Sequence, residues 1–239
     1  MSVKLGFVAK SQLGRLAKSW EQGQHLIISG DTGSGKTQLG RYVDQIRIDR
    51  GGFLVVFVVK KQDKTIEQDY AGWTRWKEWK KNPSPHENKV LLWPDVSKAK
   101  TQREARDIQR EIFATAIAGL WRVGKWTVDF DEGLYMCSPA FMNMSDDIGM
   151  LHALGRSEGL TVVTKMQRPS NVPLIVYGSA SNAFIGRTRN QDDNKRLAEL
   201  GGRASSRELQ ARISGLGRHD FLWIPVAEDW EPEIVNLRR

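Results

Sequence analysis

The sequence predicts an α/β fold, with a mainly parallel central sheet flanked by helices, from three observations. Residues 30–37 read GDTGSGKT, a complete G-x-x-x-x-G-K-[ST] phosphate-binding loop, or P-loop. This loop lies between an apolar strand candidate at 25–29 and a segment whose apolar residues recur at helical spacing. Residues 53–59 then form a continuous apolar run, which is typical of a strand covered on both faces. Strand, helix and strand in this order indicate an α/β architecture.

The elements around the P-loop follow from local signals. Residues 1–23 are a basic, glycine-containing lead-in with a short helix expected at 13–20, and one P-loop domain is expected at 24–239. The helix after the loop should end at the glycine pair 51–52. One face of that helix is apolar and comprises Leu39, Tyr42, Val43 and Ile46.

A helical, tryptophan-rich insertion is expected within the domain at about 60–124. It contains a turn at 82–85 and a short strand at 90–93. Thr101 and Glu104 match a capping box, which predicts the start of a long helix.

The second half of the chain continues the alternation of strands and helices. Ser205 and Glu208 form a second capping box. Strands are expected at 126–130, 160–164, near 184–185 and at 220–224, with a helix at about 145–156.

Composition restricts the class of protein. The longest apolar run is too short to cross a bilayer and the start of the chain has no signal-peptide core, so we expect a cytoplasmic protein without a transmembrane segment. A single cysteine, Cys137, excludes internal disulfides and multi-cysteine metal sites. The net charge of +8 is compatible with a polyanionic partner such as nucleic acid.

The residue types of the P-loop predict a nucleoside triphosphate, ATP, with Mg²⁺. Its glycines allow backbone amides to converge on an anion at a helix N-terminus. Lys36 supplies a cation for the β- and γ-phosphates, and Thr37 supplies a hydroxyl for Mg²⁺. The expected nucleotide-binding residues are Gly30, Asp31, Thr32, Gly33, Ser34, Gly35, Lys36, Thr37 and Gln38.

Polar residues that follow two later strands complete the predicted site. Asp131 is expected to be the metal carboxylate and Glu132 the base that orients or activates water. Asp129 is the competing metal carboxylate, because the phase of its strand is open. Gln167 follows the next strand, where a polar residue can sense the γ-phosphate.

These residues together resemble the FtsK/HerA superfamily of nucleic-acid-pumping ATPases. The most specific segment is GRSEGL at 155–160 leading to MQRPS at 166–170, which looks like the family's GRxxGhxhhhxTQRPS pattern. The resemblance implies a RecA-like core in a homo-oligomeric ring, usually a hexamer. It also implies that Arg156 is the arginine finger that reaches a neighbour's γ-phosphate, with Arg187 as the second candidate.

The sequence departs from the family pattern at two places. Lys165 and Met166 replace the small pair that usually precedes the sensor glutamine, and Gly133 follows Glu132 where a second acidic residue is common. The chain looks most like the minimal genome-packaging ATPases of membrane-containing icosahedral viruses and phages. That likeness implies double-stranded DNA and a capsid vertex as partners.

Three other functions remain open from the sequence: a cellular or plasmid DNA translocase, a nucleotide-gated assembly protein, and a small-molecule phosphotransferase. A strip at 73–81 could also follow a phosphate backbone, since tryptophans alternate there with basic residues. We expect its tryptophans to pack internally, because their spacing of three is a packing pattern. The strip consists of Trp73, Arg75, Trp76, Lys77, Trp79, Lys80 and Lys81.

Overall fold

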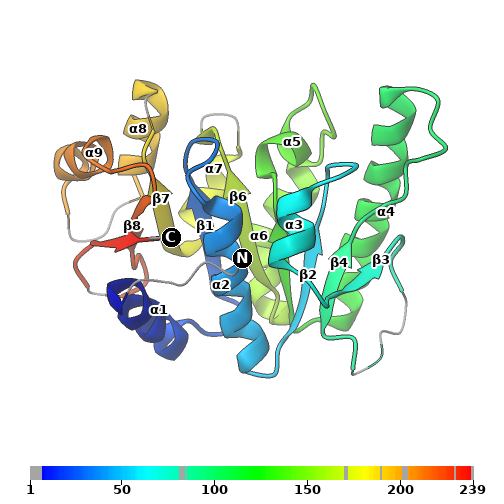
Figure 1. Ribbon diagram of the computed structural model, residues 1–239, viewed down its shortest axis with the longest axis horizontal. Coiled ribbons are helices and arrows are strands. Elements are labelled where there is room, and N and C mark those ends of the chain that lie inside the picture. Colours follow the sequence, from blue (N-terminus) through cyan, green and yellow to red (C-terminus); the bar gives the residue numbers. More distant parts are fainter. Residues whose placement is uncertain are drawn as a thin grey trace.

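The computed structural model describes residues 7–80, 84, 86–169, 172–188, 190–200, 204–228 and 230–237, and contains one mixed sheet (Figure 1). The strand order is β3-β4-β2-β5-β6-β1-β7-β8-β9. All neighbours from β3 to β7 pair in parallel, whereas β8 and β9 add an antiparallel edge. The strands are β1 (His25–Ser29), β2 (Phe53–Phe57), β3 (Thr74–Trp76), β4 (Lys89–Leu92), β5 (Trp126–Phe130), β6 (Thr161–Met166), β7 (Ala180–Gly186), β8 (Asp220–Ile224) and β9 (Glu233–Asn236).

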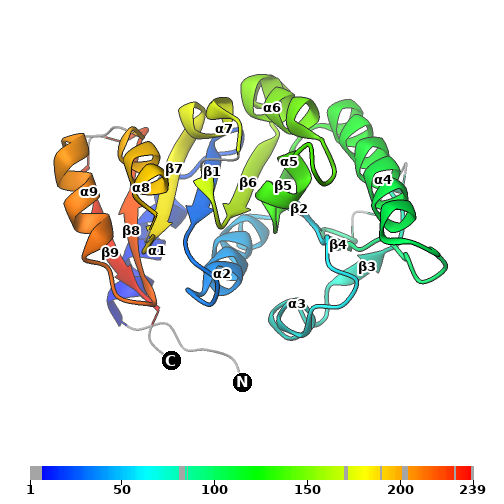
Figure 2. The ribbon, with the colours of Figure 1, turned by 90° about the horizontal axis from the view of Figure 1, so that it is seen from above.

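Helices cover both faces of the sheet, as Figure 2 shows from above. One face carries α1 (Phe7–Ser19), α2 (Lys36–Asp49) and α3 (Lys64–Asp69). The other face carries α4 (Gln102–Val123), α5 (Gly133–Cys137), α6 (Ser145–Leu154), α7 (Leu174–Gly178), α8 (Gln191–Ala198) and α9 (Ser206–Ser214). A short 3₁₀ turn, η1 (Gly155–Glu158), joins α6 to β6.

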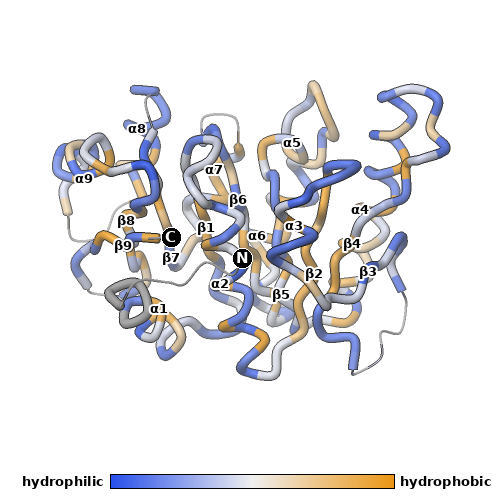
Figure 3. Tube along the Cα trace, in the orientation of Figure 1, coloured by the Kyte–Doolittle hydropathy of each residue, from blue (hydrophilic) through white to orange (hydrophobic). Residues whose placement is uncertain are grey.

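The hydrophobic core is divided by the sheet. The larger part lies between the sheet and the face of α4, α6, α7, α8 and α9. Two smaller clusters lie under α1 and α2 and under α3 on the opposite face. Apolar colour accordingly follows the central strands in Figure 3. Burial on both faces explains why β2 reads as a continuous apolar run.

The α/β prediction is confirmed, and several local signals are confirmed with it. α2 begins at Lys36, directly after the P-loop. The Thr101 hydroxyl accepts a hydrogen bond from the Glu104 amide at 3.1 Å, and the Ser205 hydroxyl accepts one from the Glu208 amide at 3.3 Å. Both capping boxes therefore start helices, α4 and α9.

The tryptophan-rich segment corrects one expectation. Residues 60–124 contain β4 close to the strand expected at 90–93, but they also contain the edge strand β3, which was not predicted. The three tryptophans of the strip are buried, as expected, through contacts with both neighbouring and distant rings. Trp73 contacts Tyr70 at 4.9 Å between ring centroids, and Trp79 contacts Trp126 at 5.6 Å.

The cations of the strip bind within the chain. Arg75 stacks on the Trp93 ring at 4.0 Å, Lys77 pairs with Asp95 at 2.9 Å and Lys80 pairs with Glu87 at 2.8 Å. These contacts indicate that the strip stabilises the fold, and they do not favour a role in binding nucleic acid. Several residues named in the sequence analysis lie outside the described residues: 81 of the strip, 82, 83 and 85 of the expected turn, and 170 of the MQRPS segment.

Two further differences concern the ends of the chain. The first helix is longer than expected and begins at Phe7, and the strand β9 was not predicted. β9 is short and pairs only with β8, so its local sequence carries little strand signal. No helix in the described part of the chain is long and apolar enough to cross a membrane.

A buried histidine makes the stability of the fold dependent on pH. Nδ1 of His25 accepts a hydrogen bond from the Val162 amide at 3.1 Å, and the ring contacts His152 with 5.0 Å between centroids. Burial is the main cause that lowers the pKa of His25 from 6.5 to about 4, and the charge of Arg156 adds to it. The neutral ring is therefore the form that the folded state holds.

We expect the free energy of unfolding to fall by about 2 kcal/mol between pH 7.5 and pH 5 through His25. The contribution is complete above the unfolded pKa near 6.5 and is lost as the pH falls towards about 4, because only the unfolded chain then takes up the proton. Urea unfolding of the wild type and of His25→Asn, whose side-chain oxygen can replace Nδ1 as acceptor, measures this. An unchanged pH dependence in the variant would contradict the assignment.

Candidate nucleotide and metal site

The P-loop adopts the conformation that an anion-binding loop requires. Gly33 and Gly35 have φ values of 75° and 101°, in the left-handed region that favours glycine. A Cβ on Gly35 would also lie 3.2 Å from Cδ1 of Leu237. The loop therefore turns tightly into the N-terminus of α2, where backbone amides and the helix dipole favour negative charge.

A cavity of about 450 Å³ lies against this loop. Its walls come from the P-loop, from the carboxyl ends of β5 and β6, and from α3. The residue before β8 and the residue after β9 also line it. The predicted site residues that line it are Thr32, Gly33, Gly35, Lys36, Thr37, Gln38, Asp131, Glu132 and Gln167. The fold thus brings three distant parts of the sequence to one place.

The Lys36 side chain folds back onto the backbone of its own P-loop. Its ammonium donates to the carbonyl oxygens of Gly30 at 2.8 Å and Asp31 at 3.0 Å. Burial lowers the pKa of Lys36, while the charges of Glu132 and Asp131 act in the opposite direction. The cation is therefore held at the mouth of the phosphate loop, facing the acidic pair.

The phase of β5 separates the two candidate metal carboxylates. Asp129 is fully buried and its Oδ2 lies 2.7 Å from Nζ of Lys165, whereas Asp131 lines the cavity. Residues 129 and 131 share one face of the strand, but only the second extends beyond the strand end. The geometry favours Asp131 over Asp129 as the residue that could hold a metal ion.

Glu132 and Gln167 are joined by hydrogen bonds across the cavity. The Gln167 amide donates to Oε2 of Glu132 at 3.1 Å, and its carbonyl oxygen accepts from the Thr32 hydroxyl at 2.9 Å. Burial, followed by the charge of Asp131, raises the pKa of Glu132. A carboxylate with a raised pKa is a better proton acceptor near neutral pH, and this one is oriented from the P-loop.

The donor set fits Mg²⁺. Thr37 and Asp131 offer one hydroxyl and one carboxylate to the same cavity, and Mg²⁺ is commonly held by one or two protein oxygens together with nucleotide phosphates. Within the described residues no group of three or more His, Cys, Asp or Glu side chains could hold a metal ion by itself. A metal at this place would therefore depend on the nucleotide.

The two candidate finger arginines lie at opposite ends of the parallel strands. Arg156 is exposed in η1, and its Cγ would be 3.1 Å from a Cβ on Gly23, so it lies at the amino end of β1. The full length of β1 separates it from the P-loop of its own chain. Arg187 follows β7 beside the P-loop, and its carbonyl accepts from the Asp31 amide at 3.4 Å.

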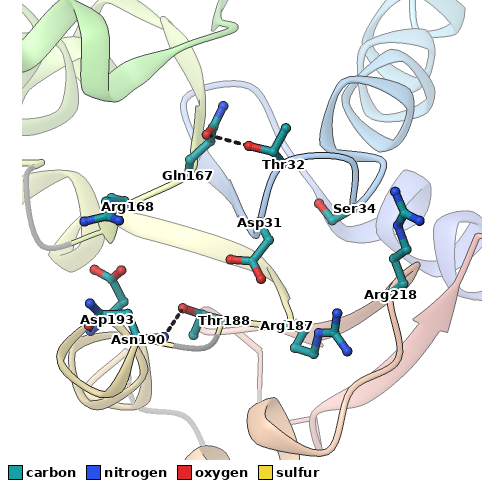
Figure 4. Close-up of a pocket in the computed structure, with 10 residues that line it drawn as sticks. All are labelled: Asp31, Thr32, Ser34, Gln167, Arg168, Arg187, Thr188, Asn190, Asp193 and Arg218. Carbon is teal, nitrogen blue, oxygen red and sulfur yellow. Dashed lines mark hydrogen bonds between the residues drawn. The ribbon is translucent and has the colours of Figure 1, made fainter.

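A second cavity of about 590 Å³ borders the other side of the P-loop (Figure 4). Three arginines line it, with Asp31 between them in the view of Figure 4. None of the three forms an ion pair with a carboxylate in the described part of the chain, and the arginines outnumber the two aspartates that line the same cavity, Asp31 and Asp193. They are Arg168, Arg187 and Arg218.

Sequence reasoning missed several residues of the site. Lys60 lines the nucleotide cavity and pairs with Asp63 at 2.7 Å; it directly follows the apolar run 53–59, so the strand-end rule that selected Asp131 could have found it. His219 contacts the Ser34 carbonyl at 3.2 Å, and Leu237 reaches the cavity from the end of β9. No local pattern marks these last two residues.

The comparisons with known proteins agree on the fold. No family model and no curated protein matches the sequence. Among solved structures, the chain is similar to B204, the DNA-packaging ATPase of Sulfolobus turreted icosahedral virus, with a TM-score of 0.64 and 15% identity over 92% of this chain and 100% of that one. VirB4 of Thermoanaerobacter pseudethanolicus has a TM-score of 0.62 and 7% identity, over 90% of this chain and 89% of that one.

A third solved structure extends the comparison. The pCW3 conjugation coupling protein TcpA, in its monomer form with ATPγS, has a TM-score of 0.52 and 13% identity over 92% of this chain and 60% of that one. These likenesses, all below 25% identity, confirm the α/β fold of a P-loop NTPase.

Gly133 allows the acidic pair to lie close to β6. A Cβ at this position would be 2.6 Å from Cγ2 of Thr164 and 3.1 Å from the Lys165 carbonyl. We expect Gly133→Ala to displace the turn that carries Glu132, to destabilise the fold by about 1–3 kcal/mol and to lower nucleotide hydrolysis. Gly178→Ala is the matched control, since nothing lies within 4 Å of its added Cβ. Equal stability and turnover of the two variants would contradict the prediction.

Proposed function

We propose that the protein is an ATP-hydrolysing motor that translocates double-stranded DNA, as a hexameric ring that packages a viral genome into a preformed capsid. The observation that carries the hydrolase assignment is the hydrogen-bonded bridge from Glu132 through Gln167 to Thr32, which links a carboxylate to the P-loop across the nucleotide cavity. A binding-only protein has no use for an oriented carboxylate with a raised pKa at this place.

Each side chain then has a defined task. Lys36 and the loop amides hold the phosphates, and Glu132 accepts a proton from water that it orients towards the terminal phosphate. Gln167 donates to Glu132 and reports the state of the terminal phosphate to the P-loop through Thr32. Mg²⁺ held by Thr37 and Asp131 would neutralise charge on the phosphate oxygens.

Three observations support duplex DNA as the substrate that is moved. The chain carries a net charge of +8, and three arginines without ion pairs in the described part of the chain surround the second cavity at the P-loop edge. B204, with its similar fold, is a DNA-packaging ATPase. A basic surface next to a nucleotide site is suited to holding a phosphate backbone while hydrolysis proceeds.

In the proposed ring, a neighbouring subunit supplies the arginine finger. Arg156 cannot reach the P-loop of its own chain, so it acts on the terminal phosphate of a neighbour, where a guanidinium stabilises the developing charge. The motor would work in the host cytoplasm, docked at a capsid vertex. A plasmid or cellular translocase is the second candidate, favoured by the similarity in fold to VirB4 and to a conjugation coupling protein.

Turnover with and without long duplex DNA, read beside the mass of the assembly, tests translocation. We expect DNA to raise ATP hydrolysis in the assembled wild type. Glu132→Gln is the control: it should bind ATP but hydrolyse it about 10²–10⁴-fold more slowly, because the base is lost. A confirmed ring whose hydrolysis ignores DNA would exclude translocation, and retained turnover in Glu132→Gln would remove that residue from the mechanism.

Mixing two inactive variants tests the role of Arg156 in a neighbouring subunit. Arg156→Ala should lower turnover by about 10³-fold, whereas Arg207→Ala, an exposed arginine on α9, should not. A 1:1 mixture of Arg156→Ala with Glu132→Gln should regain activity, because about a quarter of its interfaces join an intact Arg156 to an intact Glu132. No recovery in mixed rings would mean that Arg156 acts elsewhere.

A further inference from the structure

Lys165 is a fully buried cation behind the nucleotide cavity. Its ammonium lies 2.7 Å from Oδ2 of Asp129 and 3.2 Å from Oδ1 of Asp131. It also donates to the Tyr70 hydroxyl at 3.3 Å, and that hydroxyl donates to Oδ2 of Asp44 at 2.7 Å. The network joins β5, β6, α2 and the end of α3 in one buried polar cluster.

The P-loop helix makes room for this side chain. A Cβ on Gly40 would lie 2.9 Å from Nζ and 3.0 Å from Cδ of Lys165. Gly40 comes three residues after Thr37, so both lie on one face of α2. The ammonium therefore lies about one helical turn along α2 from Thr37, towards the protein interior and away from the cavity.

The contact with Asp131 exceeds what burial of a lysine requires. A buried ammonium needs a carboxylate partner, and Asp129 already supplies one at the shorter distance. The second contact is an ion pair with an oxygen of the cavity-lining carboxylate that has no hydrogen-bond partner in the described part of the chain. Oδ1 of Asp131 is buried, so Oδ2 is the oxygen that remains for the cavity.

We propose that Lys165 is a positioning residue, which holds Oδ1 of Asp131 so that its other oxygen is presented to a metal ion beside Thr37. This inference rests on the proposed function, in which Asp131 is the metal carboxylate. Partners that orient a metal ligand from behind commonly change metal affinity or activity by about 10–100-fold when they are removed. Lys165 also lies two residues before Gln167, so β6 supplies the contact to Asp131 and leads directly into the sensor glutamine.

The test replaces both members of the buried ion pair, Lys165 and Asp129, because removing Lys165 alone would leave buried carboxylates without a partner. Lys165→Met/Asp129→Asn is compared with Asp129→Asn, which keeps the lysine beside Asp131. Mn²⁺ binding to the ADP-loaded protein, measured by electron paramagnetic resonance, is the main readout. We expect the double variant to bind Mn²⁺ about 10–100-fold more weakly than Asp129→Asn, with ADP binding in the absence of metal unchanged.

A second variant moves the ammonium without removing its charge. Gly40→Ala places a methyl group against the flexible end of Lys165 and favours helix, so the fold should persist. We expect weaker Mn²⁺ binding, whereas Gly14→Ala on α1, with nothing within 4 Å of its added Cβ, should match the wild type. Gly40→Ala decides the question if the double variant does not fold.

Mn²⁺ affinity in Gly40→Ala equal to that of the wild type would overturn the proposal, as would equal affinity in a folded double variant and in Asp129→Asn. The test is separate from translocation. Weaker Mn²⁺ binding together with hydrolysis that ignores DNA would support Lys165 as a positioning residue while excluding the motor. A wild type that binds no Mn²⁺ with ADP would remove both.

Discussion

The candidate site depends on the hydrogen bonding of β1, β5 and β6 as adjacent parallel strands. Ser29 is in register with Met166, and Phe130 with Thr164. The residues that follow these strands therefore lie together at the carboxyl end of the sheet. The P-loop, the acidic pair and the sensor glutamine meet only because of this alignment. A slip of one residue in β6 would turn Gln167 to the other face of the sheet.

The parts of this arrangement that could be predicted are those that local chemistry specifies. The P-loop needs glycines and a lysine in fixed order, and a strand covered on both faces reads as a continuous apolar run. The rest is decided by contacts between distant segments. Asp129 and Asp131 share a strand face, so only the end of β5 and the position of Lys165 separate their roles. The tryptophans of the strip are buried as their spacing indicated, but they lie in and around the strand β3, and their rings pack against Tyr70 and Trp126.

Three lysines at different depths balance the acidic groups of the site. Lys36 faces the cavity from the P-loop, Lys60 approaches from the end of β2, and Lys165 lies behind the carboxylates. The charges of Asp131 and Glu132 favour the protonated form of both Lys36 and Lys60. Asp131 and Glu132 can therefore lie side by side in a partly buried site, because cations contact or face them from three separate elements.

The last strand gives the P-loop one of its walls. Leu237 lies against Gly35, its amide donates to the His219 carbonyl at 3.0 Å, and His219 contacts the carbonyl of Ser34. During synthesis the P-loop leaves the ribosome some two hundred residues before Leu237 does. A nascent chain therefore has an incomplete nucleotide cavity until β9 has left the ribosome, so the P-loop cannot present its complete site for ATP while it is being synthesised.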